Sequence, residues 1–176
     1  MTVAHATGTD RLAAVAATLD AEVIVNVQGD LPLLYPAALT ACVAALNLDP
    51  RLEMASLMTP IRDHAEWRSP HVVKVVTSED GFALYFSRSP LPYWRATPDG
   101  AVLGRRHIGL YTYRRETLLA LAAAPRTGLE RAEELEQLRA LERGVRIKMI
   151  EVDSATPEVD TAEDLERVRR LVEGDG

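Results

Sequence analysis

The clearest indication of the fold class is the stretch Val23-Ile24-Val25-Asn26-Val27-Gln28-Gly29-Asp30. Its first five residues are mostly β-branched with little alternation of apolar and polar side chains, which favours a strand covered on both faces. The residues from Gln28 to Pro32 end this strand. Pro36 can occupy the first turn of a helix that we expect to run to about Leu46. A buried strand followed by a helix predicts a layered α/β fold.

The rest of the chain continues this alternation. We expect further helices at 11–19 (capped by Thr9 or Asp10), 115–124, 129–142 and 161–172, and further strands at 54–59, 108–113 and 145–152. The helix at 129–142 has an apolar stripe and is closed by Gly144. Two runs, 72–76 and 82–86, flank Ser78-Glu79-Asp80-Gly81 and predict a hairpin. These elements predict an α/β fold with a largely parallel sheet and a hairpin arm.

Composition predicts one globular domain spanning residues 1–176, with 72–113 as a hairpin subregion. Of 176 residues, 47% are hydrophobic, and the formal net charge is -6, so no overall positive field favours nucleic acid as a partner. Cys42 has no second cysteine to pair with, which fits a reducing compartment. The first residues lack the pattern of a secretory signal, and the uncharged stretch 31–48 is broken by prolines. We therefore expect no membrane partner and a cytoplasmic location.

Two acidic residues follow expected strands. Asp30 lies at the carboxyl end of a buried strand, where α/β sheets bind ligands, and its carboxylate could hold Mg²⁺. Alternatively, Gly29-Asp30 is an ordinary turn or helix cap. Asp160 lies between the last strand and the last helix, where a helix N-cap is the simpler interpretation. A metal site requires the two carboxylates to converge.

Basic and polar groups supply further candidates. The pair Arg105-Arg106 with His107, and also Arg88, suit an anionic ligand, although a solvated loop end is the alternative. Glu136 and Gln137 lie beside the apolar stripe, facing either solvent or a cleft. The turn Thr7-Gly8-Thr9-Asp10-Arg11 enters a helix, where backbone N–H groups can meet an anion. The other histidines, His5, His64 and His71, lack metal-ligand spacing, and we treat them as surface or structural residues.

Taken together, these segments resemble the 3-deoxy-manno-octulosonate (Kdo) cytidylyltransferase family, also called CMP-Kdo synthetases. The resemblance rests on seven stretches in the family's order across nearly the whole chain. They are Gly8-Thr9-Asp10-Arg11-Leu12, Val25-Asn26-Val27-Gln28-Gly29-Asp30, Val72-Val73-Lys74-Val75-Val76, Ala83-Leu84-Tyr85-Phe86-Ser87-Arg88, Arg106-His107-Ile108-Gly109-Leu110-Tyr111, Leu135-Glu136-Gln137-Leu138-Arg139, and Val159-Asp160-Thr161 before Glu163-Asp164-Leu165-Glu166-Arg167-Val168.

The resemblance implies a three-layer nucleotidyltransferase-like (Rossmann-like) fold and transfer of CMP from CTP to Kdo for lipopolysaccharide synthesis, in a homodimer. It implies that Asp30 and Asp160 are catalytic and hold Mg²⁺. By the same resemblance, the residues that line the sugar-acid pocket are Gln28, His107, Tyr111, Glu136 and Gln137, with Arg88 and Arg106 as carboxylate or phosphate contacts. Gly8, Thr9 and Arg11 would contact the nucleotide.

The sequence departs from the family in three places. Family members begin with a strand and an Ala-Arg…Ser-x-Arg…Lys loop that grips the triphosphate, and no such segment precedes Met1 here. We therefore expect a fold without its first βα unit and weak or no activity for this chain alone. Leu31 stands where the family usually has Glu, and Ala4 replaces an acidic residue. Two other functions stay open: a nucleotidyltransferase for another sugar acid or a sugar phosphate, and an inactive remnant that serves as a binding or oligomerisation module.

Overall fold

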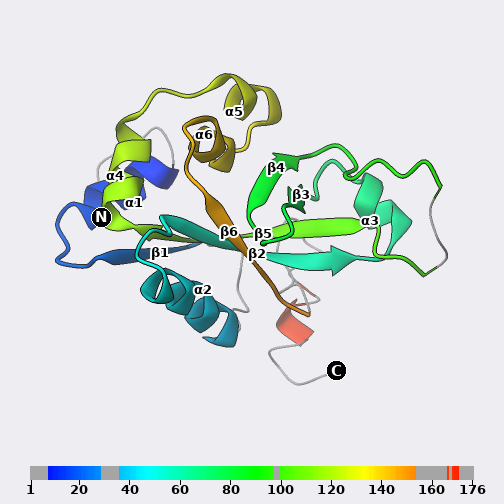
Figure 1. Ribbon diagram of the computed structural model, residues 1–176, viewed down its shortest axis with the longest axis horizontal. Coiled ribbons are helices and arrows are strands. Elements are labelled where there is room, and N and C mark those ends of the chain that lie inside the picture. The colour runs from blue at the N-terminus through cyan, green and yellow to red at the C-terminus, as the bar shows by residue number, and fades with distance from the viewer. Residues whose placement is uncertain (1–7, 29–35, 97–99, 154–165, 167, 171–176) are drawn as a thin grey trace.

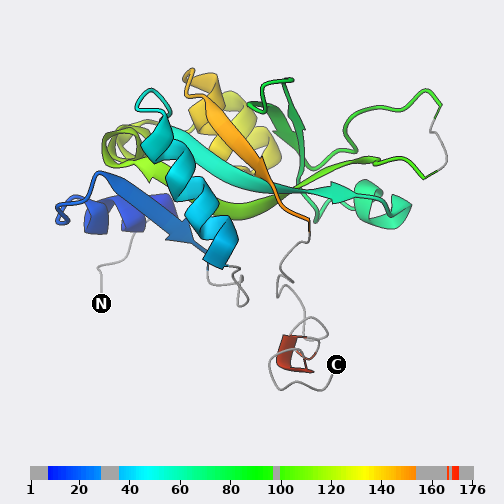
Figure 2. The same cartoon turned by 60° about the horizontal axis from the view of Figure 1, so that its bottom comes forward.

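The protein is built around one twisted sheet with helices on both faces (Figures 1 and 2). The computed structural model describes residues 8–28, 36–96, 100–153, 166 and 168–170. Within this part of the chain, the strands are β1 (Val23–Val27), β2 (Met54–Ile61), β3 (Lys74–Thr77), β4 (Ala83–Ser87), β5 (Gly104–Arg114) and β6 (Ile147–Glu151). The helices are α1 (Gly8–Ala16), α2 (Pro36–Leu48), α3 (His64–Arg68), α4 (Arg115–Ala123), α5 (Gly128–Glu133) and α6 (Gln137–Glu142).

Two apolar clusters fix helices α1, α2, α4 and α6 to the sheet. On one face, side chains from α1, α4 and α6 pack on Ile24, Tyr111 and Tyr113. On the other face, Cys42 and Leu46 of α2 pack with alternate residues of β2 and β5. Alternation along β5 therefore divides its side chains between two cores, as expected for a strand covered on both sides. The three-layer α/β architecture predicted from the sequence is confirmed.

The sheet is mixed, which corrects the expectation of a largely parallel one. Its strand order is β4-β3-β5-β2-β6, with β1 also paired to β5. Strands β2 and β6 are parallel, whereas the other four pairings of the described strands are antiparallel. The reason is that β5 returns from the hairpin region in the opposite direction and inserts between β1 and β2. Because strand order depends on long-range packing, local patterns did not reveal it.

One edge of β5 is shared by two strands, and this arrangement creates the site. Strand β1 pairs along the end of β5, with its last pair at Val27 and Leu110. Strand β3 pairs near the start of β5, at Lys74 opposite Arg106 and Val75 opposite Arg105. Strand β2 pairs with the other edge of β5, on both sides of Gly109 and Leu110. Residues 107–109 of β5 thus belong to the ladder of neither β1 nor β3, and the sheet opens there.

Several predicted elements are found as expected, including β1, the Val72–Phe86 hairpin and α4. In the hairpin turn Gly81 has φ 76°, as its position requires. Strand β2 continues through Pro60 to Ile61, beyond the expected end of this strand at residue 59. Proline has no backbone N–H to donate to a neighbouring strand. Pro60 is tolerated in β2 because the described pairing of β2 with β6 ends at Met58, two residues before it.

The predicted helix at 129–142 is wrong: two short helices replace it. Helix α5 ends at Glu133, and the left-handed backbone of Glu134 (φ 53°, ψ 47°) then turns the chain before α6 begins. Leu135 and Leu138 of the predicted stripe are buried, but Leu129 is largely exposed. Gly144, with φ 81°, follows the end of α6 as predicted. The predicted helix at 161–172 falls mostly outside the described residues.

Candidate functional site

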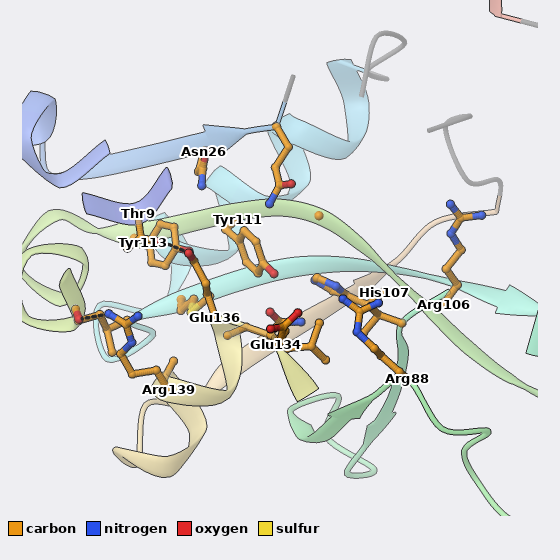
Figure 3. Close-up of a pocket in the computed structure, with 18 of the residues that line it drawn as sticks. Thr9, Asn26, Arg88, Arg106, His107, Tyr111, Tyr113, Glu134, Glu136 and Arg139 are labelled. Atoms are coloured by element: carbon orange, nitrogen blue, oxygen red, sulfur yellow. Dashed lines mark hydrogen bonds between the residues drawn. The ribbon is translucent and has the colours of Figure 1, made fainter. Parts of the chain in front are cut away.

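A cavity of about 460 Å³ lies where the edge of β5 is shared between β1 and β3 (Figure 3). Its floor is the face of β5 that carries His107, Tyr111 and Tyr113. Gly109 occupies the position between His107 and Tyr111 on this face and contributes no side chain. A Cβ at Gly109 would lie 3.4 Å from Cδ of Gln28, so the missing side chain leaves room for Gln28 at the end of β1.

Most of the residues that we predicted for the site lie together around this cavity. The structure places eight of them in its wall: Thr9, Gln28, Arg88, Arg106, His107, Tyr111, Glu136 and Gln137. They come from α1, β1, the end of β4, β5 and the start of α6, which are far apart in the sequence. Gly8 and Arg11 lie on exposed positions of α1 and do not line the cavity. Asp30 and Asp160 lie outside the described residues.

Glu133 and Arg88 connect α5 to the end of β4. The carboxylate of Glu133 accepts hydrogen bonds from Ser87 Oγ (2.6 Å) and the backbone N–H of Arg88 (3.0 Å). Arg88 Nε donates to the carbonyl oxygen of Glu133 (2.9 Å), and Nη1 donates to that of Pro70 (3.0 Å). Burial alone would raise the pKa of Glu133, but the bonds from Ser87 and Arg88 hold it below its usual value. Arg88 is thereby held in place at the cavity.

Lys74 stabilises the end of β4, where Arg88 lies, from a buried position. Its side chain is fully buried, and Nζ donates to the carbonyl oxygens of Ser69 (2.7 Å), Val72 and Arg88. Burial lowers the pKa of Lys74, and the nearby Glu133 carboxylate opposes this shift. Since each partner is a backbone oxygen, Lys74 joins the segment before β3 to the end of β4.

The adjoining part of the wall is formed by the turn between α5 and α6. Thr9 Oγ1 donates to the carboxylate of Glu136, which connects α1 to the beginning of α6. Further along α6, the buried Arg139 forms a bidentate ion pair with the buried Glu130. Its Nε donates to Oε2 (2.8 Å) and its Nη2 donates to Oε1 (2.5 Å). The hydrogen bond from Arg139 lowers the pKa of Glu130 despite burial. This pair fixes α6 against α5 and so supports the wall.

His107 is the buried titratable group of the cavity. Its exposed fraction is 6%, and Nε2 lies 2.9 Å from Ser56 Oγ. Burial, with a smaller contribution from the charge of Arg106, lowers the pKa of His107 to about 3. The imidazole is therefore neutral near pH 7. Rings of Phe86 and Tyr111 pack on it at centroid distances of 5.0 and 5.3 Å.

The cavity offers both donors and acceptors. Arg88 and Arg106 can bind a carboxylate or a phosphate, although Arg106 Nη1 also lies 3.5 Å from the carboxylate of Glu66. Glu134 and Glu136 can accept hydrogen bonds from hydroxyl groups. Such a mixed lining suits a small anion that also carries several hydroxyls.

Sequence reasoning missed several residues of the cavity wall. Those with polar or aromatic side chains are Asn26, His71, Tyr113, Glu134 and Arg139. Two of them gave usable signals: Asn26 is the polar residue of an otherwise β-branched strand, and Tyr113 continues the two-residue period of His107 and Tyr111. His71, which we treated as surface or structural, is exposed at the rim. Glu134 became a wall residue only because of the unpredicted helix break.

No helix in the described part of the chain is long and apolar enough to cross a membrane. The same residues contain no group of three or more His, Cys, Asp or Glu side chains that could hold a metal ion. Because Asp30 and Asp160 are not among them, this finding leaves the predicted metal site untested.

Known proteins resemble this chain in both sequence and structure. A family model described as cytidylyltransferase matches residues 1–147. A 3-deoxy-manno-octulosonate cytidylyltransferase from Syntrophotalea carbinolica is 53% identical, with 97% of this chain covering 71% of that protein. One from Geobacter sulfurreducens is 50% identical, with 93% of this chain covering 69% of it.

A solved structure, a CMP:2-keto-3-deoxy-manno-octonic acid synthetase complexed with CTP, superposes with a TM-score of 0.90. Its sequence is 39% identical, and the match covers 98% of this chain and 70% of that one. The likeness extends over the cavity walls as well as the sheet, because nearly the whole chain is covered. This chain belongs to the cytidylyltransferase family and, within it, to the 3-deoxy-manno-octulosonate cytidylyltransferases.

Proposed function

We propose that this protein transfers the CMP group of CTP to 3-deoxy-manno-octulosonate and releases pyrophosphate. In this reaction a sugar hydroxyl oxygen forms a bond to the α-phosphorus of CTP, the bond to the pyrophosphate oxygen breaks, and the hydroxyl proton is lost. The observation that carries the proposal is the mixed donor and acceptor lining of the cavity, in a chain that superposes on a CTP-bound family member. The product would serve lipopolysaccharide synthesis.

The described residues supply binding and orientation. Arg88, held by Glu133 and Pro70, and Arg106 are the groups that we propose for the carboxylate or phosphates. Gln28, Tyr111, Glu136 and Gln137 surround the space for the sugar. Holding the attacking hydroxyl and the phosphorus in one geometry removes much of the entropic cost of a bimolecular reaction.

Turnover is tested by measuring pyrophosphate release from CTP, Kdo and Mg²⁺ with the 176-residue chain. Other nucleotides, other sugar acids and sugar phosphates serve as competing substrates and should react more slowly. Calorimetry provides a second readout, since absence of binding for both CTP and Kdo would contradict the proposed function itself.

We also propose that Asp30 and Asp160 hold Mg²⁺. Gln28 lines the cavity, and Asp30 follows it by two residues in the sequence. A carboxylate there suits Mg²⁺, which when bound would neutralise charge on the phosphates. In calorimetric titrations with Mg²⁺ and CTP, Asp30→Asn should lose metal binding, whereas Asp20→Asn, an exposed control, should retain it. Equal affinities would contradict this assignment.

We further propose a homodimer, as the family resemblance implies, in the cytoplasm where CTP is available. Analytical ultracentrifugation of the purified chain tests the association, and a single species with the mass of one chain would contradict it.

A further inference from the structure

The described chain contains a buried hydroxyl, that of Ser56, whose single proton has three possible acceptors. The register between β2 and β5 shifts after Ser56: Ser56 pairs with Tyr111, and Leu57 pairs with Ile108. Gly109 and Leu110 therefore have no partner in β2, as in a β-bulge. Ser56 is fully buried beneath this bulge, and its Oγ lies 2.7 Å from the carbonyl oxygen of Leu110.

The position of the Ser56 proton follows from these distances. Oγ also lies 2.9 Å from Nε2 of His107 and 3.4 Å from the carbonyl oxygen of Ile108. If the hydroxyl donated to Nε2, the oxygens of Ser56 and Leu110 would face each other at 2.7 Å with no proton between them. The hydroxyl therefore donates to the Leu110 carbonyl, and Nε2–H of His107 donates to Ser56 Oγ.

This arrangement determines which histidine nitrogen can meet a ligand. A neutral imidazole carries one proton, so protonation of Nε2 leaves Nδ1 as a bare acceptor. His107 lines the cavity, and the side-chain hydrogen bond that the structure gives its ring is the one between Nε2 and Ser56 Oγ. Packing against Phe86 and Tyr111 restricts rotation of the ring. Nδ1 is therefore a neutral acceptor on a ring that lines the cavity and whose rotation is restricted.

We propose that Ser56 is a positioning residue that holds the His107 proton on Nε2, so that Nδ1 accepts a hydrogen bond from a hydroxyl of the bound sugar acid. This assignment rests on the function proposed above, which supplies the sugar acid. It explains a buried hydroxyl that does not itself reach the cavity. It also gives His107 a role that a protonated imidazole, which has two donors and no acceptor, could not fill.

The tautomer can be read directly, without activity. In the full chain labelled with ¹⁵N-histidine, at pH 7.5, His107 should show a protonated Nε2 and an unprotonated Nδ1, with the signal assigned through its loss in His107→Asn. Ser56→Ala should mix the two tautomers and weaken Kdo binding about tenfold in calorimetry. Ser56→Thr keeps the hydroxyl and should restore the single tautomer and the Kdo affinity. Thr112→Val removes a buried hydroxyl on the opposite face of the sheet and should leave the tautomer and the affinity unchanged.

A native His107 protonated on Nδ1 would overturn the proposal, and so would an unchanged tautomer together with unchanged affinity in Ser56→Ala. The tautomer in the native chain keeps the test decisive if Ser56→Ala does not fold. Failure of the proposed function would give a different result, in which the native chain does not bind Kdo but His107 still carries its proton on Nε2. That result would contradict the contact between Nδ1 and the sugar acid, and it would leave the role of Ser56 in fixing the tautomer intact.

Discussion

Burial of His107 makes the stability of the protein depend on pH. The folded-state pKa of about 3 lies below the unfolded value of about 6.5. As the pH falls below 6.5 the unfolded chain binds a proton that the folded protein does not, so stability is lost from there down to about pH 3. For this one group the loss approaches about 4 kcal/mol at pH 3.5.

Urea unfolding between pH 7 and pH 4 measures this effect. Titrating carboxylates contribute as well, so the comparison is with His107→Asn, which removes the imidazole and should give a shallower decline in unfolding free energy. His64→Asn alters an exposed histidine and should leave the slope of the native protein unchanged. Parallel curves for the native protein and His107→Asn would contradict the assignment of a neutral, buried His107.

Glu134 combines a strained backbone with a position in the cavity wall. Its φ of 53° is unfavourable for any residue with a Cβ, and glycine adopts it without that cost. Glu134→Gly should therefore raise the unfolding free energy by up to about 1 kcal/mol while weakening Kdo binding, because the carboxylate is lost. Glu116→Gly, in the first turn of α4, should instead lower stability by about 1 kcal/mol and leave binding unchanged. A destabilised Glu134→Gly would show that the turn is not strained.

At the scale of elements, local chemistry predicted the strands and helices whose ends it marks. The β-branched run of β1 and the Ser78–Gly81 turn each carry a local cause, and both predictions were confirmed, as was the helix expected at 115–124. The break at Glu134 has no Gly or Pro to announce it, since helix-forming residues surround it. Tertiary contacts, such as those of Glu133 with Ser87 and Arg88, compete there with helix propensity and prevail.

The sequence predicted which residues belong to the candidate site, but not how the sheet brings them together. The family resemblance implied that His107, Tyr111, Glu136 and Gln137 line one pocket, and the structure places all four in one cavity wall. The sharing of the β5 edge between β1 and β3, which opens the cavity, depends on the order of strands in the sheet. Local periodicity reports which face a residue occupies and carries no information on which strand lies beside it.

Lys74 connects two elements that would otherwise part at the cavity. Replacing it with Met leaves the carbonyl oxygens of Ser69, Val72 and Arg88 without their common donor, so Lys74→Met should lower the unfolding free energy by about 3 kcal/mol. Lys148→Met changes the other lysine of the chain, which is partly exposed and donates to one carbonyl, and should cost less than about 1 kcal/mol. Urea denaturation compares them, and equal losses would contradict the role of Lys74.

At the scale of the whole molecule, the cavity is the place where distant parts of the chain meet. Helix α1 and strand β1 form one side, and the β3–β4 hairpin with the α5–α6 turn forms another, over the floor of β5. A ligand that touches all of these walls opposes their separation. Since it binds the folded chain and not the unfolded one, Kdo should stabilise the molecule as a whole.

This coupling predicts a ligand-dependent melting temperature. At a Kdo concentration of about 100 times its Kd, the gain of about 2.7 kcal/mol corresponds to a rise in Tm of about 5–10 °C for a chain of this length. Gly109→Leu would fill the space beside Gln28 and should abolish the rise. Ala120→Leu adds the same side chain to an exposed position of α4 and should keep it. A full rise in Gly109→Leu, measured by calorimetric melting, would mean that Kdo binds outside this cavity, because a leucine there and the sugar cannot occupy the same volume.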